Sequence, residues 1–213
     1  MSGSLTRERA FVFRISHRDN APWIMANGMH CRNSHVADPN FISIGNPDLI
    51  DKRQSRSVPC PPFGTLSDYV PFYFTPFTPM LLNIKTGFNL IKRRPLDEIV
   101  IFVTSLWSLQ EKGVPVVFTD RHAVLNAARF SSDLTMLDWI DWVILRGRDF
   151  KRDPEDPGKF ERYQAEALVH RHLPMTAVVG IVCYNDTVKV AVQREAEAHG
   201  HALQVISKPG WFI

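Results

Sequence analysis

The sequence predicts a mixed α+β domain, and three observations support this class. Short apolar runs typical of core strands recur along the chain, a few capped helical segments lie among them, and long irregular stretches connect the elements. The pattern lacks the regular strand–helix alternation of a nucleotide-binding Rossmann sheet. It also lacks a GxGxxG or phosphate-loop motif, so a dinucleotide would have to bind in another way.

The first expected elements are a strand and a short helix. Residues 11–15 are apolar and aromatic, which predicts a buried strand. A helix should follow, with Asp19 as its N-cap, Pro22 in its first turn and Gly28 as its stop signal.

A long loop is expected next. Residues 29–62 show little periodicity and are rich in Asn, Ser, Pro and Gly. Loops of this length usually bind ligands or are disordered, and apolar anchors such as Phe41 and Ile44 favour a binding loop. Residues 69–74, YVPFYF, then predict a strand, although Pro71 would remove a ladder hydrogen bond and indicates an edge or a bulge.

The second half of the chain predicts the remaining core. Further strands are expected at residues 99–103, 116–118, 142–145, 178–184 and 202–206. Residues 122–130 predict a short helix. A longer helix is expected at about 187–199, capped by Asp186 and stopped by Gly200.

Composition and length are those of a soluble globular protein. Of the 213 residues, 45% are hydrophobic and 22% charged, which favours one domain over residues 1–213. No apolar run is long enough to span a membrane and residues 1–9 are polar, so a cytoplasmic location is expected. Three widely spaced cysteines argue against a disulfide framework and against a zinc site.

The charge balance permits a polyanionic partner without requiring one. The net charge is +3 and the isoelectric point is about 8.8. Basic residues gather in three loops, at 52–56, 92–94 and 146–152. From composition alone, solvated loop charges explain these clusters at least as well as a binding surface does.

Three side chains invite a chemical interpretation, each with a structural alternative. Glu166 lies between Ala165 and Ala167 at the edge of an apolar run, where a carboxylate needs a partner or a function. A salt bridge to a nearby arginine is the alternative. Taken singly, Arg53 is more often a solvated loop residue, and Tyr73 is more often part of a core.

Five stretches together resemble the DarT family of DNA ADP-ribosyltransferases. They are HRDNAPWIMANG (17–28), SIGNPDLIDKR (43–53), LSDYVPFYFTPFTPML (66–81), VVFTDRHA (116–123) and RDPEDPGKFERYQAEAL (152–168). The resemblance covers nearly the whole chain. It implies the ADP-ribosyltransferase (PARP-like) fold, with split, mostly antiparallel sheets, peripheral helices and long loops, and with NAD held in the cleft between the sheet halves.

The resemblance also implies roles for single residues. Glu166 matches the catalytic glutamate, which would bind the ribose 2′-hydroxyl and stabilise the oxocarbenium-like sugar that forms as nicotinamide leaves. Arg53 matches a second essential residue, expected to hold the diphosphate or to help the target base lose its proton. Tyr73 matches the aromatic residue that stacks on nicotinamide.

Further NAD contacts are implied at Arg14, Ser16, Asn20 and Gly45. Many relatives have a histidine where this chain has Arg14, so its partner atom on NAD stays open. Residues 29–53 correspond to a loop that folds over NAD. Within that loop Gly45 would allow close backbone approach, although a plain turn glycine is the alternative.

For the acceptor, the resemblance implies thymidine in single-stranded DNA, presented by residues 121–165. The candidate DNA contacts are Met80, His122, Arg148, Arg152 and Arg162. Duplex DNA should be a poor substrate, because pairing covers the reacting Watson–Crick position of thymine. NAD is the co-substrate, no metal is expected, and the implied partner of such a toxin is a macrodomain antitoxin, DarG.

Two other hypotheses remain open at this point. The modest basic charge is compatible with an ADP-ribosyltransferase that modifies protein or RNA. The aromatic run at 69–74 beside basic loops is also compatible with a non-catalytic module that binds single-stranded nucleic acid.

Overall fold

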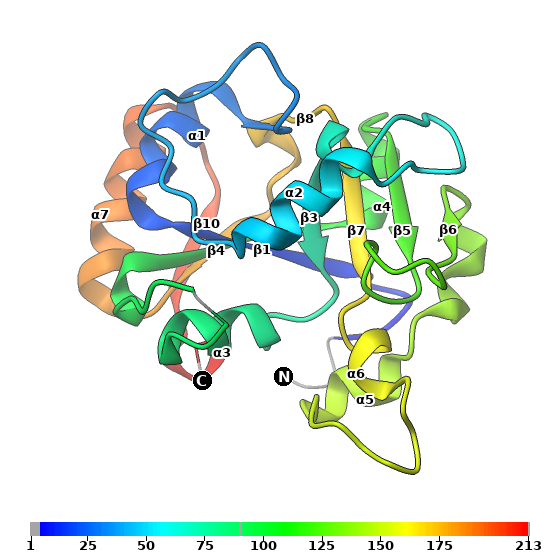
Figure 1. The fold of residues 1–213 in the computed structure, drawn as a ribbon. Helices are drawn as coiled ribbons and strands as arrows, with labels where there is room; N and C mark the ends of the chain where they lie inside the picture. Colours follow the sequence, from blue (N-terminus) through cyan, green and yellow to red (C-terminus); the bar gives the residue numbers. More distant parts are fainter. Residues whose placement is uncertain (1–4, 90, 213) are drawn as a thin grey trace.

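A central β-sheet organises the molecule (Figure 1). The computed structural model describes residues 5–89 and 91–212, and these residues form an eight-stranded sheet in the order β10-β9-β4-β1-β3-β7-β5-β6. The strands are β1 (Phe11–His17), β3 (Tyr69–Tyr73), β4 (Ile99–Ser105), β5 (Val116–Thr119), β6 (Phe130–Ser131), β7 (Glu166–His170), β9 (Gly180–Cys183) and β10 (Gln204–Ser207). All neighbours are antiparallel except β9 and β10. A separate pair joins β2 (Met29–His30) to β8 (His172–Leu173).

The sheet is split at its centre, between β1 and β3. Among the described residues these two strands pair at one position, Phe13 with Tyr73, whereas β1 pairs with β4 along its whole length. The split explains Pro71. The backbone carbonyl of Pro71 faces β1 and accepts a hydrogen bond from Nη1 of Arg14 at 2.9 Å, so its missing N–H lies on the side where no ladder runs. β3 is an interior strand and not the edge strand that Pro71 indicated, but Pro71 has no pairing partner on the β1 side. The expected split, mostly antiparallel sheet is confirmed.

Helices lie around the sheet. They are α1 (Ala21–Asn27), α2 (Pro47–Ser55), α3 (Pro79–Thr86), α4 (Leu106–Glu111), α5 (Trp142–Gly147), α6 (Lys159–Arg162) and α7 (Asp186–Ala198). Short 3-10 turns occur at Arg18–Asn20, Leu66–Asp68, Leu96–Glu98, Leu134–Trp139, Met175–Ala177 and Pro209–Trp211. In Figure 1, α1 and α7 cover the β4, β9 and β10 half, and α2 crosses in front of the split.

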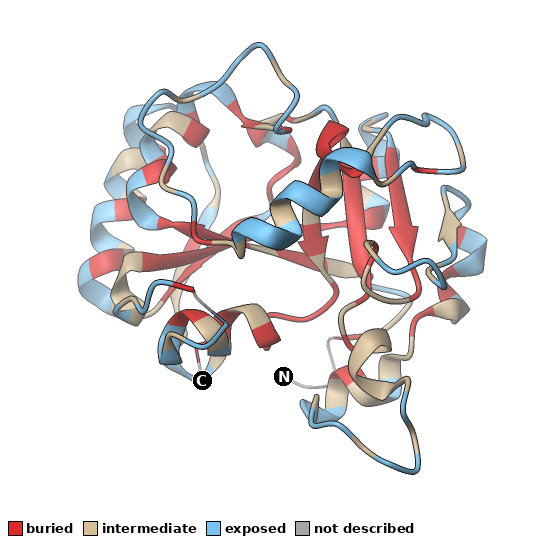
Figure 2. Cartoon of the chain, in the orientation of Figure 1, coloured by how far each residue is buried: buried red, intermediate tan, exposed pale blue. Residues whose placement is uncertain are grey.

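The interior is built from the strands. Figure 2 shows that the central strands are buried along most of their length, whereas α2 is largely exposed. Phe72, Phe74, Phe102 and Phe118 are among the largest fully buried side chains, and they come from both halves of the sheet. One continuous core therefore runs under both halves of the sheet, and polar side chains of β1, β3 and β7 meet at the split.

Two helix caps differ from the expected ones by one or two residues. The ring of His17 accepts the N–H of Asp19, so Asp19 is inside a 3-10 turn and α1 begins only at Ala21. The side chain of Asn185 accepts the N–H of Val188, so Asp186 is the first residue of α7 and not its cap. Both helices end where expected, at Gly28 and near Gly200.

Two expected elements in the second half are wrong. Residues 142–145 form the helix α5, in which the side chain of Asp141 caps the N–H of Ile144. A short apolar run fits a buried helix as well as a strand, and periodicity alone cannot separate them. Residues 122–130 form consecutive turns that lead into β6, because side chains from elsewhere bind this backbone in place of helical hydrogen bonds.

The expected long loop at 29–62 contains a helix that the sequence pattern did not reveal. In α2 the side chain of Asn46 accepts the N–H of Leu49, and Pro47 occupies the first turn. All nine residues of α2 are described and none is buried. Because the helix buries no apolar face, it has no hydrophobic period to detect.

Gly28 provides a test of the tight packing between the end of α1 and β8. Its φ of +78° favours glycine, and an added Cβ would lie 2.6 Å from the backbone oxygen of Leu173, which cannot move aside. We expect Gly28→Ala to lower the free energy of unfolding by about 2 kcal/mol or more in urea denaturation. The matched control is Gly200→Ala, whose φ is +71° but whose added Cβ would meet nothing within 4 Å in the described structure. Equal losses in the two variants would contradict the packing argument.

Candidate active site

The register of three strands brings the candidate residues together. Glu166 is the first residue of β7 and pairs with Tyr73 of β3, and Tyr73 in turn pairs with Phe13 of β1. Arg14 follows Phe13 at the split and reaches Pro71 with its guanidinium. The split of the sheet therefore positions a carboxylate, a phenol and a guanidinium at one place.

Glu166 is fixed by partners on both carboxylate oxygens. Its side chain is 3% exposed, Oε2 accepts from Nη1 of Arg53 at 2.8 Å, and Oε1 accepts the backbone N–H of Ala123 at 2.9 Å. Nδ1 of His122 lies 3.4 Å from Oε1. Burial by itself raises the pKa of Glu166, but Arg53, the protonated form of His122 and the Ala123 N–H outweigh it, so the pKa is below its ordinary value. Glu166 is thus a buried anion in a defined orientation.

Arg53 comes from the last turn of α2 and closes the site from above the sheet. Its side chain is 14% exposed, and its Nη2 atom is buried with no hydrogen-bond partner among the described residues. Burial, followed by repulsion from Arg53, lowers the pKa of Arg14 to about 10. Two half-buried guanidinium groups therefore lie near one carboxylate. A positive excess with an unused donor suits an anionic group such as a diphosphate.

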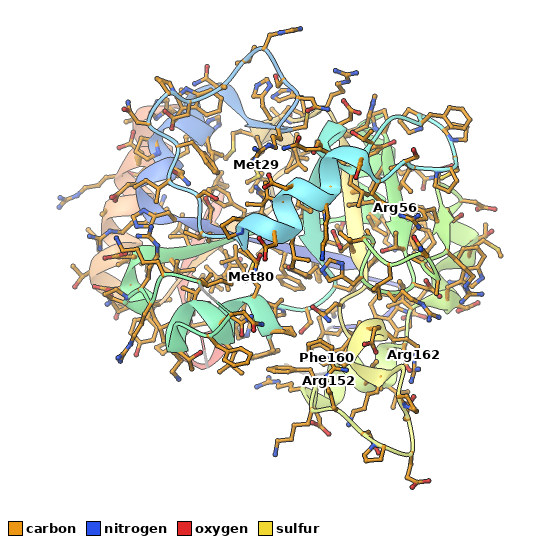
Figure 3. All side chains as sticks on the ribbon, in the orientation of Figure 1. Met29, Arg56, Met80, Arg152, Phe160 and Arg162 are labelled. Carbon is orange, nitrogen blue, oxygen red and sulfur yellow. The ribbon has the colours of Figure 1, made fainter. Side chains whose placement is uncertain are left out.

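Tyr73 and Met80 form an apolar wall beside the carboxylate. The hydroxyl of Tyr73 donates to Sδ of Met80 at 3.6 Å, and Met80 belongs to the first turn of α3. Burial and the nearby Glu166 raise the pKa of Tyr73, so its phenol stays neutral. In Figure 3 the label of Met80 lies between α2 and α3. A neutral aromatic ring with a thioether neighbour is suited to stacking against a flat heterocycle.

Ser16 and Asn20 lie next to the 29–53 segment, which Asn20 contacts at Ile42. Asn20 uses its amide to hold the backbone of Ile42, with Nδ2 donating to the carbonyl at 3.0 Å and Oδ1 accepting the N–H at 2.9 Å. Nδ2 of Asn20 also donates to Oγ of the buried Ser16 at 3.3 Å. At Gly45 an added Cβ would meet only the flexible Ile50 side chain, at 3.2 Å. Asn20 therefore anchors the 29–53 segment.

His122, expected as a DNA contact, lies beside Glu166 together with Arg53 and the Ala123 N–H. We call these four residues the carboxylate cluster. Burial lowers the pKa of His122, with Glu166 opposing the shift and Arg53 adding to it, so the imidazole is favoured in its neutral form. Its Nδ1 accepts the N–H of Val124 at 3.3 Å, which leaves the proton of the neutral ring on Nε2. In this form Nδ1, the ring nitrogen next to Glu166, carries no proton, so the neutral imidazole does not donate to the carboxylate.

Two of the three basic DNA candidates, Arg152 and Arg162, lie apart from this cluster. Figure 3 shows Arg152, Phe160 and Arg162 together near α6, away from Met80 and Arg56. The guanidinium of Arg148 stacks on Phe77, with 3.6 Å to the ring centroid, and that of Arg152 stacks on Phe160 at 4.9 Å. Arg162 is bound by two carboxylates, Asp141 at 3.2 Å and Asp156 at 2.6 Å. Arg162 is accordingly part of an internal network, whereas Arg152 is largely exposed.

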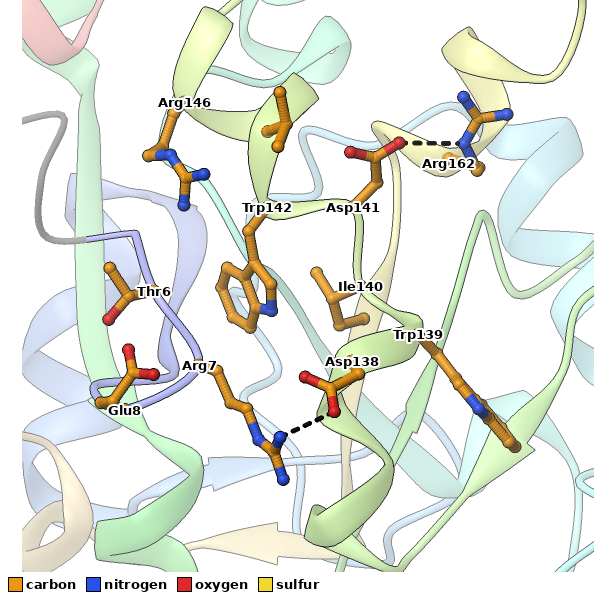
Figure 4. Close-up of a pocket in the computed structure, with 11 residues that line it drawn as sticks. Thr6, Arg7, Glu8, Asp138, Trp139, Ile140, Asp141, Trp142, Arg146 and Arg162 are labelled. Atoms are coloured by element: carbon orange, nitrogen blue, oxygen red, sulfur yellow. Dashed lines mark hydrogen bonds and ion pairs between the residues drawn. The ribbon is translucent and has the colours of Figure 1, made fainter.

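A cavity of about 650 Å³ lies elsewhere, between residues 6–8 and 138–146 (Figure 4). Arg7 and Asp138 form an ion pair at its edge, at 2.7 Å. Its lining contains three arginines and three carboxylates, so it offers no charge preference for NAD. The carboxylate cluster is the stronger candidate site. Its charged groups are shielded from solvent, and Nη2 of Arg53 has no hydrogen-bond partner among the described residues.

The sequence did not reveal the residues that contact Glu166 through the backbone or that hold such a residue in place. Ala123 contributes an N–H, for which no side-chain pattern exists. Asp120 and Arg56, which hold the turns around Ala123, are within or near the stretches that resemble the family but carry no signal of their own.

Among the described residues no group of three or more His, Cys, Asp or Glu side chains could hold a metal ion. No described helix has the length and apolar character that a membrane crossing needs.

Comparison with known proteins places this geometry in a family. The DNA ADP-ribosyl transferase of Escherichia coli O127:H6 (strain E2348/69 / EPEC) is 51% identical over 212 residues, which is 100% of this chain and 97% of that relative. The structure of Thermus sp. 2.9 DarT in complex with ADP-ribosylated ssDNA matches with a TM-score of 0.88 and 30% identity, covering 97% of both chains. The Thermus sp. 2.9 complex with NAD+ matches with a TM-score of 0.83 and 30% identity, covering 97% of this chain and 98% of that one.

The split sheet and its buried carboxylate thus define an NAD-dependent DNA ADP-ribosyltransferase. The family model for "ssDNA thymidine ADP-ribosyltransferase, DarT" matches residues 13–213. The chain belongs to the DarT family.

Proposed function

We propose that this chain transfers ADP-ribose from NAD to thymine bases of single-stranded DNA, with Glu166 as its catalytic carboxylate. One observation carries the proposal: Glu166 is a buried anion held by Arg53 and by the Ala123 N–H at the split of the sheet. Breaking the bond between ribose C1′ and nicotinamide creates positive charge on the sugar. A fixed carboxylate that accepts the 2′-hydroxyl stabilises that charge and orients the ring.

The surrounding residues support binding of the dinucleotide. Arg53 and Arg14 supply buried positive charge for the diphosphate, and the unused Nη2 of Arg53 offers it a donor. Tyr73 offers a neutral ring for nicotinamide. Ser16 and Gly45 remain proposed contacts, and Asn20 would act by holding the 29–53 segment over NAD.

Family membership and the ADP-ribosylated ssDNA complex of the Thermus relative support the acceptor. In the reaction the C1′–nicotinamide bond breaks, a bond from C1′ to N3 of thymine forms, nicotinamide leaves with the bonding electron pair, and the N3 proton is released. His122, which lies 3.4 Å from Glu166, and Met80, which contacts Tyr73, are proposed to contact the base. Arg148 and Arg152 would contact the strand farther along, within the 121–165 segment that presents the acceptor.

The acceptor can be identified directly. A single-stranded oligonucleotide containing all four bases is incubated with the chain and NAD, digested to nucleosides and analysed by mass spectrometry. We expect an ADP-ribosyl adduct on thymidine alone. The same strand annealed to its complement should react at least about tenfold more slowly, because opening a base pair costs a few kcal/mol.

Two outcomes would contradict the proposed acceptor. Label from NAD found only on separate protein or RNA pools would indicate a different substrate class. Release of nicotinamide that does not depend on any oligonucleotide, together with unmodified thymidine, would do the same.

We also propose that residues 1–213 act as one catalytic domain and as the toxin of a toxin–antitoxin pair. The proposal is supported by membership of the DarT family, because modified template bases would block replication in the cell that makes the enzyme. The expected partner is the macrodomain antitoxin DarG. Its action on the modified oligonucleotide should return thymidine to its original mass, and a persistent adduct would count against this pairing.

A further inference from the structure

The turns that follow β5 are closed by a buried acidic residue. Asp120 is 1% exposed, its Oδ1 accepts the backbone N–H of Arg129 at 2.9 Å, and its Oδ2 accepts Nε of Arg129 at 2.9 Å and Nη2 of Arg121 at 3.1 Å. Burial alone would raise the pKa of Asp120, but Arg121 and Arg129 hold it below its ordinary value. Asp120 is therefore a charged group that ties the two ends of the 120–129 segment together.

The 120–129 segment contains the backbone N–H that binds Glu166. Within it Ala123 donates its N–H to Oε1 of Glu166 at 2.9 Å, and His122 donates its own N–H to the carbonyl of Glu161 at 3.0 Å. These hydrogen bonds need the chain to reverse direction between residues 120 and 129. The β5–β6 pairing and the backbone hydrogen bond from the Asp120 N–H to the Arg129 carbonyl, at 3.4 Å, hold the ends of this reversal, and the Asp120 carboxylate adds the side-chain contacts.

A second side chain holds the same segment from the outside. Arg56, the residue after α2, donates from Nη2 to the carbonyl of Leu125 at 2.9 Å and from Nη1 to Oδ1 of Asn126 at 3.3 Å. Its position at the end of α2 is visible in Figure 3. Arg53, three residues earlier, binds the other oxygen of Glu166. The segment that carries Arg53 and the segment that carries Ala123 are thus joined through Arg56.

We propose that Asp120 is a positioning residue for the transferase reaction, which holds the Ala123 N–H on Oε1 of Glu166, and that Arg56 supports the same turn from α2. The inference rests on the proposed role of Glu166. Each carboxylate oxygen has two lone pairs, so Glu166 can keep these contacts and still accept the ribose 2′-hydroxyl. Because a shift of about 1 Å in a reacting group costs on the order of a hundredfold in rate, the orientation of the Glu166 carboxylate matters as well as its charge.

The test compares kinetics of Asp120→Asn with those of the unmodified chain. Asparagine has nearly the same size, but its amide turns a donor toward Arg121 and Arg129 where an acceptor is needed. We expect kcat to fall about 10- to 100-fold while KM for NAD changes less than about threefold, because the change acts on the transition state. Asp186→Asn is the matched control: it removes a carboxylate that binds Ser207 at the start of α7, a helix that packs against α1, β9 and β10 at the other end of the sheet from β7, and it should leave kcat unchanged.

A pH profile separates positioning from a general loss of structure. The charged or titratable groups that face Glu166 are Arg53 of α2, His122 of the turn segment and Tyr73 of β3. Loss of the Ala123 N–H removes one contact that favours the ionised form of Glu166. The acid limb of kcat/KM should therefore move to higher pH in Asp120→Asn.

Arg56→Ala provides a second route if Asp120→Asn folds poorly. It removes the hydrogen bonds from Arg56 to Leu125 and Asn126 without burying a new polar group. We expect kcat to fall several-fold and the acid limb of kcat/KM to move to higher pH, as in Asp120→Asn. Wild-type kcat and pH profile in either folded variant would overturn the inference. If Glu166→Gln is inactive while both variants behave like the unmodified chain, only this inference fails; if Glu166→Gln stays active, the proposed function fails first.

Discussion

Glu166→Gln is expected to lower the rate of ADP-ribosyl transfer by at least about a hundredfold. Glutamine keeps an oxygen for the Ala123 N–H, but it carries no charge to oppose the positive sugar of the transition state. The loss should appear mainly in kcat, measured by nicotinamide release with saturating oligonucleotide. Residual binding of NAD should persist, because the guanidinium groups of Arg14 and Arg53 remain.

The control for this prediction is the same chemical change elsewhere. Glu195→Gln alters a partly exposed residue of α7 that pairs with His199 at 3.4 Å, and its activity should match that of the unmodified chain. The stability of Glu166→Gln needs a parallel denaturation curve, because the substitution leaves Arg53 with no anionic partner in a buried place. A folded Glu166→Gln variant with full activity would reject the proposed mechanism.

The structure also reconciles two interpretations of Glu166 that the sequence left open. The alternative of a salt bridge to an arginine is confirmed, because Arg53 binds Oε2 at 2.8 Å. That partner is the same residue that the family resemblance indicated as essential. A catalytic carboxylate must stay ionised in a site closed to water, and a buried guanidinium keeps it so. The ion pair and the proposed catalytic role are therefore compatible.

The strands were predictable because they bury continuous apolar runs. Residues 99–103 and 116–118 lie in β4 and β5, at the centre of the core, where a sequence pattern and a packing requirement coincide. The helix α2 escaped prediction for the opposite reason, since an exposed helix leaves no hydrophobic period. Residues 142–145 were too short a run for strand and helix to be distinguished.

The candidate site was predictable only through the family resemblance. Arg53 and Glu166 are 113 positions apart, and no local pattern links them. The fold brings them together through the β3–β7 register and through α2. Backbone donors such as Ala123, and supports such as Asp120, depend on the path of a turn segment and so could not be inferred from residue types. The resemblance likewise gave no hint that Arg162 is bound by two carboxylates.

Arg53→Ala should cause a loss comparable to that of Glu166→Gln, on the order of a hundredfold in kcat/KM, for two combined reasons. It removes the cation that lowers the pKa of Glu166, and it removes the buried Nη2 donor proposed to bind the diphosphate. Steady-state kinetics with NAD varied separates these effects, because lost diphosphate binding raises KM and a disturbed Glu166 lowers kcat.

Arg53→Lys distinguishes charge from geometry at this position. A lysine restores a positive charge beside Glu166 but offers a single ammonium in place of a planar fork, so it cannot bind Oε2 and a second anion in the same arrangement. We expect Arg53→Lys to recover the low pKa of Glu166, read from the acid limb of the pH profile, while leaving KM for NAD raised about tenfold or more. Arg194→Lys on the exposed side of α7 is the matched control and should be silent. Full activity of Arg53→Lys would mean that this site needs only a cation opposite its carboxylate, and the proposed contact between Arg53 and the diphosphate would have to be abandoned.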